Sequence, residues 1–295
     1  MRKSKAPVGA SLVILSSIFY ASYGVWTKLM GDFFDGYTAA MWRSLIVIII
    51  LAPIAIYSRQ IEPIILKQNW RYILGMFIAS LFTWGPLYYA ILHAGIGISL
   101  AIAYASIVLG AFFFGWLFAN ERFTKDKAIS AVLGILGLGL IFSPSVSSLG
   151  LVALLGALVG GLASSANMVF SKQIRYNATQ STLVLWTASV FANIIMAILF
   201  SEYYPPIGLQ IQWLYLLFFA VASVVASWAL VKGLKLIDAG AAGVLGLLEI
   251  VFGVLFGIIF FRESPDKLAL LGMAIIIVAA AIPYIKEYRA KLIAT

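Results

Sequence analysis

The sequence predicts an all-α integral membrane protein of ten transmembrane helices, arranged as two inverted five-helix repeats. Three observations predict it: the composition, the spacing of long apolar runs, and a similarity between the two halves. Of the 295 residues, 63% are hydrophobic and 11% are charged, against roughly 25% charged residues in a soluble domain. A soluble core of this size could not bury so much apolar surface, whereas lipid tails can solvate it.

Ten apolar runs approach the roughly 20 residues that a spanning helix needs. They are 7–30, 36–57, 71–92, 97–119, 127–143, 149–172, 179–200, 211–233, 239–261 and 267–286. The runs are continuous, which favours helices over the strands of a barrel. The first run follows the basic segment 1–5. Because it is long and has no clear cleavage site, we interpret it as a retained spanning helix rather than a signal peptide.

The basic residues are distributed unevenly between the two sides of the predicted helices. Sixteen of the 20 Lys and Arg residues fall on the side of the N-terminus, and the other four are Lys28, Arg43, Arg262 and Lys267. This bias predicts a cytoplasmic (inner) membrane protein with both termini in the cytoplasm. The net charge of +9 does not indicate nucleic-acid binding, because the basic residues sit in short turns, where they contact anionic lipid.

The two halves of the chain share a set of matched residues. The pairs, 142 to 144 residues apart, are Tyr23 and Asn167, Lys28 and Lys172, Trp42 and Trp186, and Glu121 and Glu263. They predict one five-helix repeat over residues 1–146 and a second over 147–295. Because five is odd, the second repeat enters the membrane from the opposite side. Transporters with such repeats bind their cargo near the midplane and open alternately to each side.

Several short motifs fit a known family. They are Trp26-Thr-Lys28, Trp42-Arg43, the Ala-Ile-Leu-His-Ala-Gly run at 90–95, Glu121-Arg-Phe-Thr124 and Leu248-Glu249. With these motifs the chain resembles an EamA-type member of the drug/metabolite transporter superfamily over nearly its whole length. The sequence departs from the family pattern at Val108 and Ile250, where proline is frequent, and at Thr187, which is not basic. The resemblance implies a central cavity between helices 1, 3, 4, 6, 8 and 9 and transport of small organic solutes, frequently export.

Glu249 is the sharpest candidate for a functional residue. It lies near the middle of the predicted helix 239–261, where a carboxylate costs at least ~2.5 kcal/mol. One interpretation is a proton site that couples transport, or an anchor for a substrate amine. The other is a protonated acid that bonds a neighbouring helix.

Aromatic and amide residues within the spans are further candidates. The predicted substrate-binding residues are Tyr20, Tyr23, Trp84, Tyr88, Tyr104, Asn167, Trp228 and Glu249. Trp84 and Tyr88 are four residues apart and should share a helix face. The alternative is structural: aromatic residues form belts at the membrane surface, and Asn167 joins two helices through Asn193.

Two lysines lie at predicted helix ends. We expect Lys28 and Lys172 to extend toward the membrane surface, like many lysines at the ends of spans. The alternative is a gating role, in which they pair with loop acids such as Asp32 or Asp35.

Some residue types and motifs are absent from the sequence, and their absence limits the classes of function to expect. There is no cysteine and one histidine, His93, so we expect no disulfide, metal or other cofactor. No phosphate-binding loop is present, so ATP does not drive the protein directly. We therefore expect a secondary carrier that exports amino acids or similar amphipathic solutes, with protons as a coupling ion, as a monomer or weak dimer. The alternatives are a membrane-embedded lipid-modifying enzyme and a multidrug or quaternary-amine carrier of the same fold.

Overall fold

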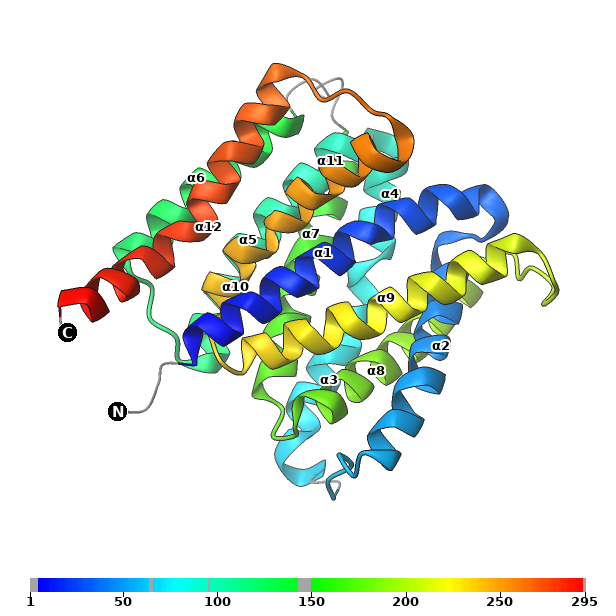
Figure 1. The fold of residues 1–295 in the computed structure, drawn as a ribbon. Helices are drawn as coiled ribbons and strands as arrows, with labels where there is room; N and C mark the ends of the chain where they lie inside the picture. The colour runs from blue at the N-terminus through cyan, green and yellow to red at the C-terminus, as the bar shows by residue number, and fades with distance from the viewer. Residues whose placement is uncertain (1–4, 64–65, 95, 143–149, 294–295) are drawn as a thin grey trace.

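A computed structural model describes residues 5–63, 66–94, 96–142 and 150–293, and every regular element in them is a helix (Figure 1). The helices are α1 (Ala6–Met30), η1 (Gly31–Phe33), α2 (Gly36–Tyr57), α3 (Leu66–Thr83), α4 (Gly85–Ala94), α5 (Ile96–Ala119), α6 (Lys125–Phe142), α7 (Leu151–Gln173), α8 (Ala178–Leu199), α9 (Ile211–Leu234), α10 (Ala239–Gly246), α11 (Leu248–Phe261) and α12 (Lys267–Ile293). The predicted repeat boundary at 146/147 lies outside the described residues.

The prediction of ten long segments is confirmed. Eight segments of the described chain are long and apolar enough to cross a membrane, with α3–α4 and α10–α11 each counting as one. The helices α6 and α12 bring the number to ten. The protein is therefore an all-α, multi-pass membrane protein.

Two of the expected helices are broken. The predicted span 71–92 is interrupted at Trp84, because Pro86 at the start of α4 has no N–H and cannot continue the α3 ladder. The predicted span 239–261 is interrupted at Leu247. Glu249 consequently lies in the first turn of α11 rather than in the middle of a continuous helix.

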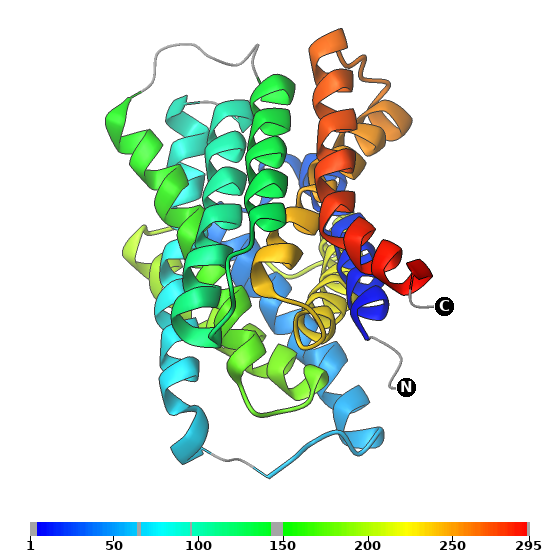
Figure 2. The ribbon, with the colours of Figure 1, turned by 90° about the vertical axis from the view of Figure 1, so that its left-hand side faces the viewer.

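The helices pack in pairs through small residues. α6 and α12 lie side by side at one edge of the molecule (Figures 1 and 2), where a Cβ added at Gly137 would be 2.8 Å from the carbonyl oxygen of Gly272. On α7, Gly156 and Gly160 face the backbone of α4 and the end of α3. Small residues on α7 thus allow this helix to approach α3 and α4 closely, whereas a Cβ added at Gly253 on α11 would meet no atom within 4 Å.

The two ends of the bundle can be told apart by their contacts. Gly9 near the start of α1 faces Ile237, and the Nζ of Lys172 at the end of α7 donates to the carbonyl oxygen of Ile237 at 2.7 Å. The helices α1 and α7 therefore run in opposite directions. We call this end, where α1 begins, the terminal end, and the opposite end the distal end; both chain termini lie toward the same side in Figure 1.

Corresponding loops in the two halves are built alike. Among the described residues, four that are not glycine have a positive φ, between 52° and 56°: Arg59, Asn120, Ser201 and Arg262. They form two pairs 142 residues apart. In the residues that follow the second pair, the N–H of Glu121 donates to the carbonyl oxygen of Gly115, and the N–H of Glu263 donates to the carbonyl oxygen of Gly257. These two hydrogen bonds are again 142 residues apart.

Candidate substrate-binding site

Four of the predicted site residues form one cluster at membrane depth. The rings of Tyr20 and Tyr23 on α1 meet edge to face with centroids 5.0 Å apart. The hydroxyl of Tyr104 on α5 donates to Glu249 Oε1 on α11 at 2.6 Å. Both tyrosines of α1 interact electrostatically with Glu249. Three helices therefore bring three phenols and one carboxyl group together.

Local structure explains how these side chains meet. Tyr20 and Tyr23 are three residues apart on a helix and so share a face. The break at Leu247 places Glu249 in the first turn of α11. All four residues are partly exposed, although the hydroxyl oxygen of Tyr23 is itself buried and has no hydrogen-bond partner among the described residues. The cluster therefore places polar groups inside the bundle.

Arg43 joins this cluster, which the sequence did not predict. It was assigned to the membrane surface, but its side chain is buried, with 4% of the residue exposed. Its guanidinium carbon lies 5.0 Å from the ring centre of Tyr23, 5.1 Å from Trp84 and 4.4 Å from Phe219. Tyr20 lies within the range of electrostatic interaction of both Arg43 and Glu249.

Four separate segments form the aromatic surroundings of Arg43. Tyr23 comes from α1, Trp84 from the break between α3 and α4, Trp186 from α8 at 5.5 Å, and Phe219 from α9. We call these four rings the aromatic cage. A sequence signal for it existed: Arg43 is the eighth residue of α2, about 10 Å from the start of the helix at 1.5 Å per residue.

Tyr88 and Trp228 lie away from the cluster. The ring of Tyr88 packs against Gly36 near the start of α2, is exposed, and interacts with Asp35 and Glu202. The N–H of Tyr88 donates to the carbonyl oxygen of Trp84 at 2.7 Å, one helical turn away, although the two rings have different neighbours, Arg43 for Trp84 and Gly36 for Tyr88. That Trp84 and Tyr88 share one face stays a prediction. The indole of Trp228 donates to Thr179 at the start of α8.

Asn167 has a structural setting. Its amide donates to Ser80 at 3.3 Å and to Thr83 at 3.2 Å, which fixes α7 against α3. Asn193 instead donates to Ser189 within its own helix. The predicted Asn167–Asn193 link is therefore wrong, although the predicted joining of helices by Asn167 holds with a different helix.

Two ion pairs lie at opposite ends of the bundle. Lys172 Nζ is 2.6 Å from Glu121 Oε1, with 17% and 9% of the side chains exposed. Lys28 Nζ is 2.9 Å from Glu263 Oε1, with 55% and 57% exposed. We call them the terminal and the distal ion pair. The lysines thus pair with the matched glutamates, which corrects both sequence interpretations: free extension to the surface and pairing with Asp32 or Asp35.

The terminal end is the more closed of the two. Besides Lys172, the carboxylate of Glu121 accepts the backbone N–H of Ala239 at 2.9 and 2.8 Å, at the start of α10. Lys127 pairs with Asp238 beside it. The described residues show no equivalent backbone partner for the carboxylate of Glu263 at the distal end.

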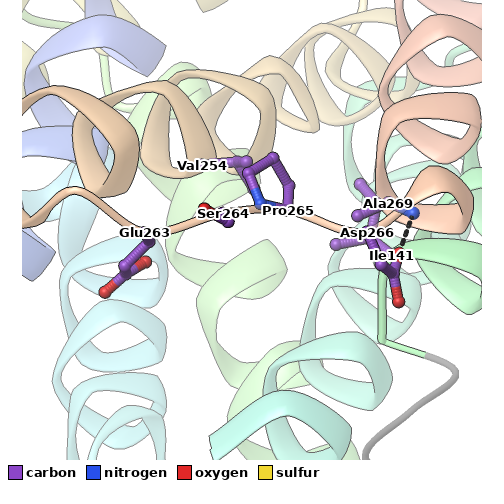
Figure 3. A pocket seen from close by; sticks show the side chains of 7 residues that line it. All are labelled: Ile141, Val254, Glu263, Ser264, Pro265, Asp266 and Ala269. Carbon is purple, nitrogen blue, oxygen red and sulfur yellow. Dashed lines mark hydrogen bonds between the residues drawn. The ribbon is translucent and has the colours of Figure 1, made fainter.

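Two surface pockets lie outside the cluster. A pocket of about 230 Å³ is bounded by Ile141 on α6, Val254 on α11 and the loop before α12, where Asp266 accepts the N–H of Ala269 at 2.7 Å (Figure 3). A second pocket, of about 570 Å³, lies between α3, α5 and α7, and none of the predicted site residues lines either one. In the described parts of the chain, no group of three His, Cys, Asp or Glu residues could hold a metal ion.

Comparisons with known proteins agree with this architecture. One solved structure matches 95% of this chain and 98% of its own with a TM-score of 0.79 at 16% identity, which shows the fold alone. The S-adenosylmethionine uptake transporter of Rickettsia felis is 22% identical over 96% of this chain and 94% of its own length. The pseudopaline exporter CntI of Pseudomonas aeruginosa is 26% identical over 65% of this chain and 67% of its own.

A family model matches almost the whole chain. The EamA-like transporter family matches residues 7–143 and again residues 151–284. The family and the names of the relatives indicate membrane transporters rather than enzymes. The chain belongs to the EamA-like transporter family.

Proposed function

We propose that the protein is a secondary carrier that exports amino acids or similar amphipathic solutes across the cytoplasmic membrane, with both termini in the cytoplasm. The observation that carries this proposal is the cluster of Tyr20, Tyr23, Tyr104 and Glu249 with Arg43. It places polar and charged groups at membrane depth, on helices from both halves of the chain. Intramembrane ionisable residues that face a bundle interior typically mark a substrate or ion pathway.

Alternating access by two inverted repeats explains the arrangement of contacts. α1 packs on α9, and α7 packs correspondingly on α3 and α4; α1 also contacts α10 and α11, as α7 contacts α5. The two halves meet through α2 with α8, α5 with α10 and α6 with α12. A pseudo-two-fold axis that exchanges the repeats accounts for all of these pairs, for the two ion pairs and for the twofold family match.

In this mechanism, the ion pairs close the two ends alternately. The terminal ion pair is buried and held by the start of α10, whereas the distal ion pair is exposed. The structure then corresponds to the state closed at the terminal end. Passage of the cargo requires the terminal pair to open and the distal end to close.

We further propose that Glu249 takes up the coupling proton. Its carboxyl group bonds Tyr104 across the interface between α5 and α11, so a change in its charge alters a contact between the two halves. The names of the relatives include both an uptake transporter and an exporter, and export is the direction proposed here. The first of these names describes a derivative of the amino acid methionine, which supports the proposed class of cargo.

A panel of ligands against purified protein tests the proposed cargo. A ligand that binds only the folded state raises the melting temperature by mass action. We expect amino acids to raise it, and quaternary amines to fail because Arg43 places a fixed cation beside the rings that would otherwise attract them. With Glu249→Gln, the pH dependence of the amino-acid effect should disappear. A panel in which only quaternary amines raise the melting temperature would replace this proposal with the multidrug alternative.

A further inference from the structure

Arg43 is a buried cation with no counter-ion in the part of the chain that the structure describes. Its Nε is fully buried and has no hydrogen-bond partner. The ion pairs found among the described residues use Lys28, Lys127 and Lys172 instead, and no described hydrogen bond involves the Arg43 side chain. A buried charge is normally paired and hydrogen-bonded because removing it from water is costly. The unpaired donors of Arg43 therefore require an explanation.

The aromatic cage offsets only part of this cost. A guanidinium over an aromatic face is attracted by the ring quadrupole, and four rings surround this one. Aromatic faces, however, accept none of the five N–H groups of the guanidinium in the plane where they are directed. The cage thus holds the group in place and leaves its hydrogen-bonding capacity unused.

The chemistry of the missing partner follows from the group itself. A guanidinium presents two parallel N–H donors that match the two oxygens of a carboxylate. Glu249 accepts a hydrogen bond from Tyr104 and forms no ion pair with Arg43 among the described residues. An anion that comes from outside the protein would satisfy the free donors, while its apolar part would lie against the cage.

We propose that Arg43 is the residue that binds the carboxylate of the cargo, so that the substrates are amino acids or other small organic acids with an apolar or aromatic side chain. This inference rests on the proposed carrier function and narrows it to carboxylate-bearing solutes. In an amino acid bound this way, the ammonium group is directed toward Tyr20 and Glu249, the opposite charge at the same site.

A set of matched ligands tests this inference on the wild-type protein. The probes are leucine and phenylalanine, their amides, their decarboxylated amines, and 3-phenylpropanoate, which has the carboxylate but no amine. We expect the amino acids and 3-phenylpropanoate to raise the melting temperature, and the amides and amines to bind at least tenfold more weakly. Equal binding by an amino acid and its amide would overturn the inference.

Variants of Arg43 then distinguish a role in ligand binding from a role in the stability of the protein. Arg43→Gln should weaken carboxylate binding at least tenfold, Arg43→Lys should weaken it less, and the control Arg122→Gln, at an exposed position, should leave it unchanged. Because Arg43→Gln removes an unpaired buried charge, we expect a melting temperature in the absence of ligand that is unchanged or higher. A residue with a purely structural role would lower it instead.

The two levels of the proposal fail in different ways. Amino-acid exchange that Arg43→Gln leaves intact would keep the carrier function and overturn the role of Arg43. Binding of 3-phenylpropanoate that depends on Arg43, without exchange of any amino acid, would keep the role of Arg43 and overturn the proposed cargo. If no carboxylate binds the wild-type protein, both are wrong.

Discussion

Neutralising Glu121 should destabilise the protein far more than neutralising Glu263, its counterpart 142 residues later. Glu121 is 9% exposed in its side chain, pairs with Lys172 at 2.6 Å and accepts the N–H of Ala239 with both oxygens. Glu121→Gln leaves Lys172, only 17% exposed, without its acid. Breaking a buried pair by removing one partner costs about 3–5 kcal/mol.

The matched variant Glu263→Gln gives the loss of stability that is expected for an exposed ion pair. Glu263 and Lys28 are more than half exposed, and an exposed ion pair contributes about 0–1 kcal/mol. At ~2 °C per kcal/mol for a chain of this size, Glu121→Gln should lower the melting temperature by about 6–10 °C, and Glu263→Gln by at most about 2 °C. Thermal unfolding of the detergent-purified proteins, at equal concentration and in one buffer, gives both values.

A double-mutant cycle assigns the loss to the ion pair. The double variant Lys172→Met/Glu121→Gln should lose less stability than the sum of the two single variants, because it leaves no unpaired charge at this site. Equal losses for Glu121→Gln and Glu263→Gln would refute the reasoning that burial makes the terminal ion pair the stronger one. Additive losses in the cycle would refute the pairing itself.

Three further predictions concern other parts of the fold. Tyr104→Phe removes the hydrogen bond to Glu249, so it should change the pH profile of transport while keeping the melting temperature within about 1–2 °C of the wild-type value. An unchanged pH profile would show that Tyr104 has no part in proton coupling. Burial lowers the pKa of Lys235, just beyond α9, to about 8. The folded state then binds fewer protons than the unfolded state between about pH 8 and 10.5, so stability should rise with pH across this window and rise less in Lys235→Met; identical slopes would contradict this assignment. Gly161→Ala should cost about 1–3 kcal/mol, because its Cβ would meet a backbone carbonyl of α5 that cannot rotate away. Gly139→Ala, with open space around it, should be neutral or slightly stabilising, and similar melting temperatures for the two alanine variants would show that α5 and α7 can separate without cost.

The spans could be predicted because lipid imposes one simple rule on the sequence. Apolar runs of about 20 residues have to be helices, and nearly every expected span coincides with an observed helix or helix pair. The breaks at Trp84 and Leu247 were missed. The first follows from Pro86, a signal that the hydropathy of the run conceals. The second has no proline, but Gly240, Gly243 and Gly246 precede Leu247 and weaken the helix there.

The candidate site was predictable only in part. The phenols and Glu249 are conspicuous as polar groups inside apolar runs, and the structure brings Tyr20, Tyr23, Tyr104 and Glu249 together. Arg43 was missed because a basic residue seven positions into a span is easily taken for one at the membrane surface. Its cage comes from four segments that are far apart in the chain, and only the tertiary fold shows that their rings converge.

The difference in basic charge between the two sides of the membrane increases once Arg43 is placed within the bundle. Arg43 is buried within the bundle and not in a loop, so the sparsely charged side loses one of its four basic residues. The asymmetry that predicts cytoplasmic termini therefore becomes larger. An impermeant thiol reagent on intact cells can check the orientation with single introduced cysteines, because the chain has none of its own.

Counterflow in liposomes tests the central claim most directly. Purified protein is reconstituted into vesicles preloaded with an unlabelled amino acid, and uptake of the same labelled amino acid is followed with time and concentration. We expect saturable uptake that depends on preloading and is lost in Arg43→Gln, because a carrier binds its cargo on each side in turn. Uptake that neither saturates nor responds to preloading, or no exchange with any amino acid or small organic acid, would contradict it.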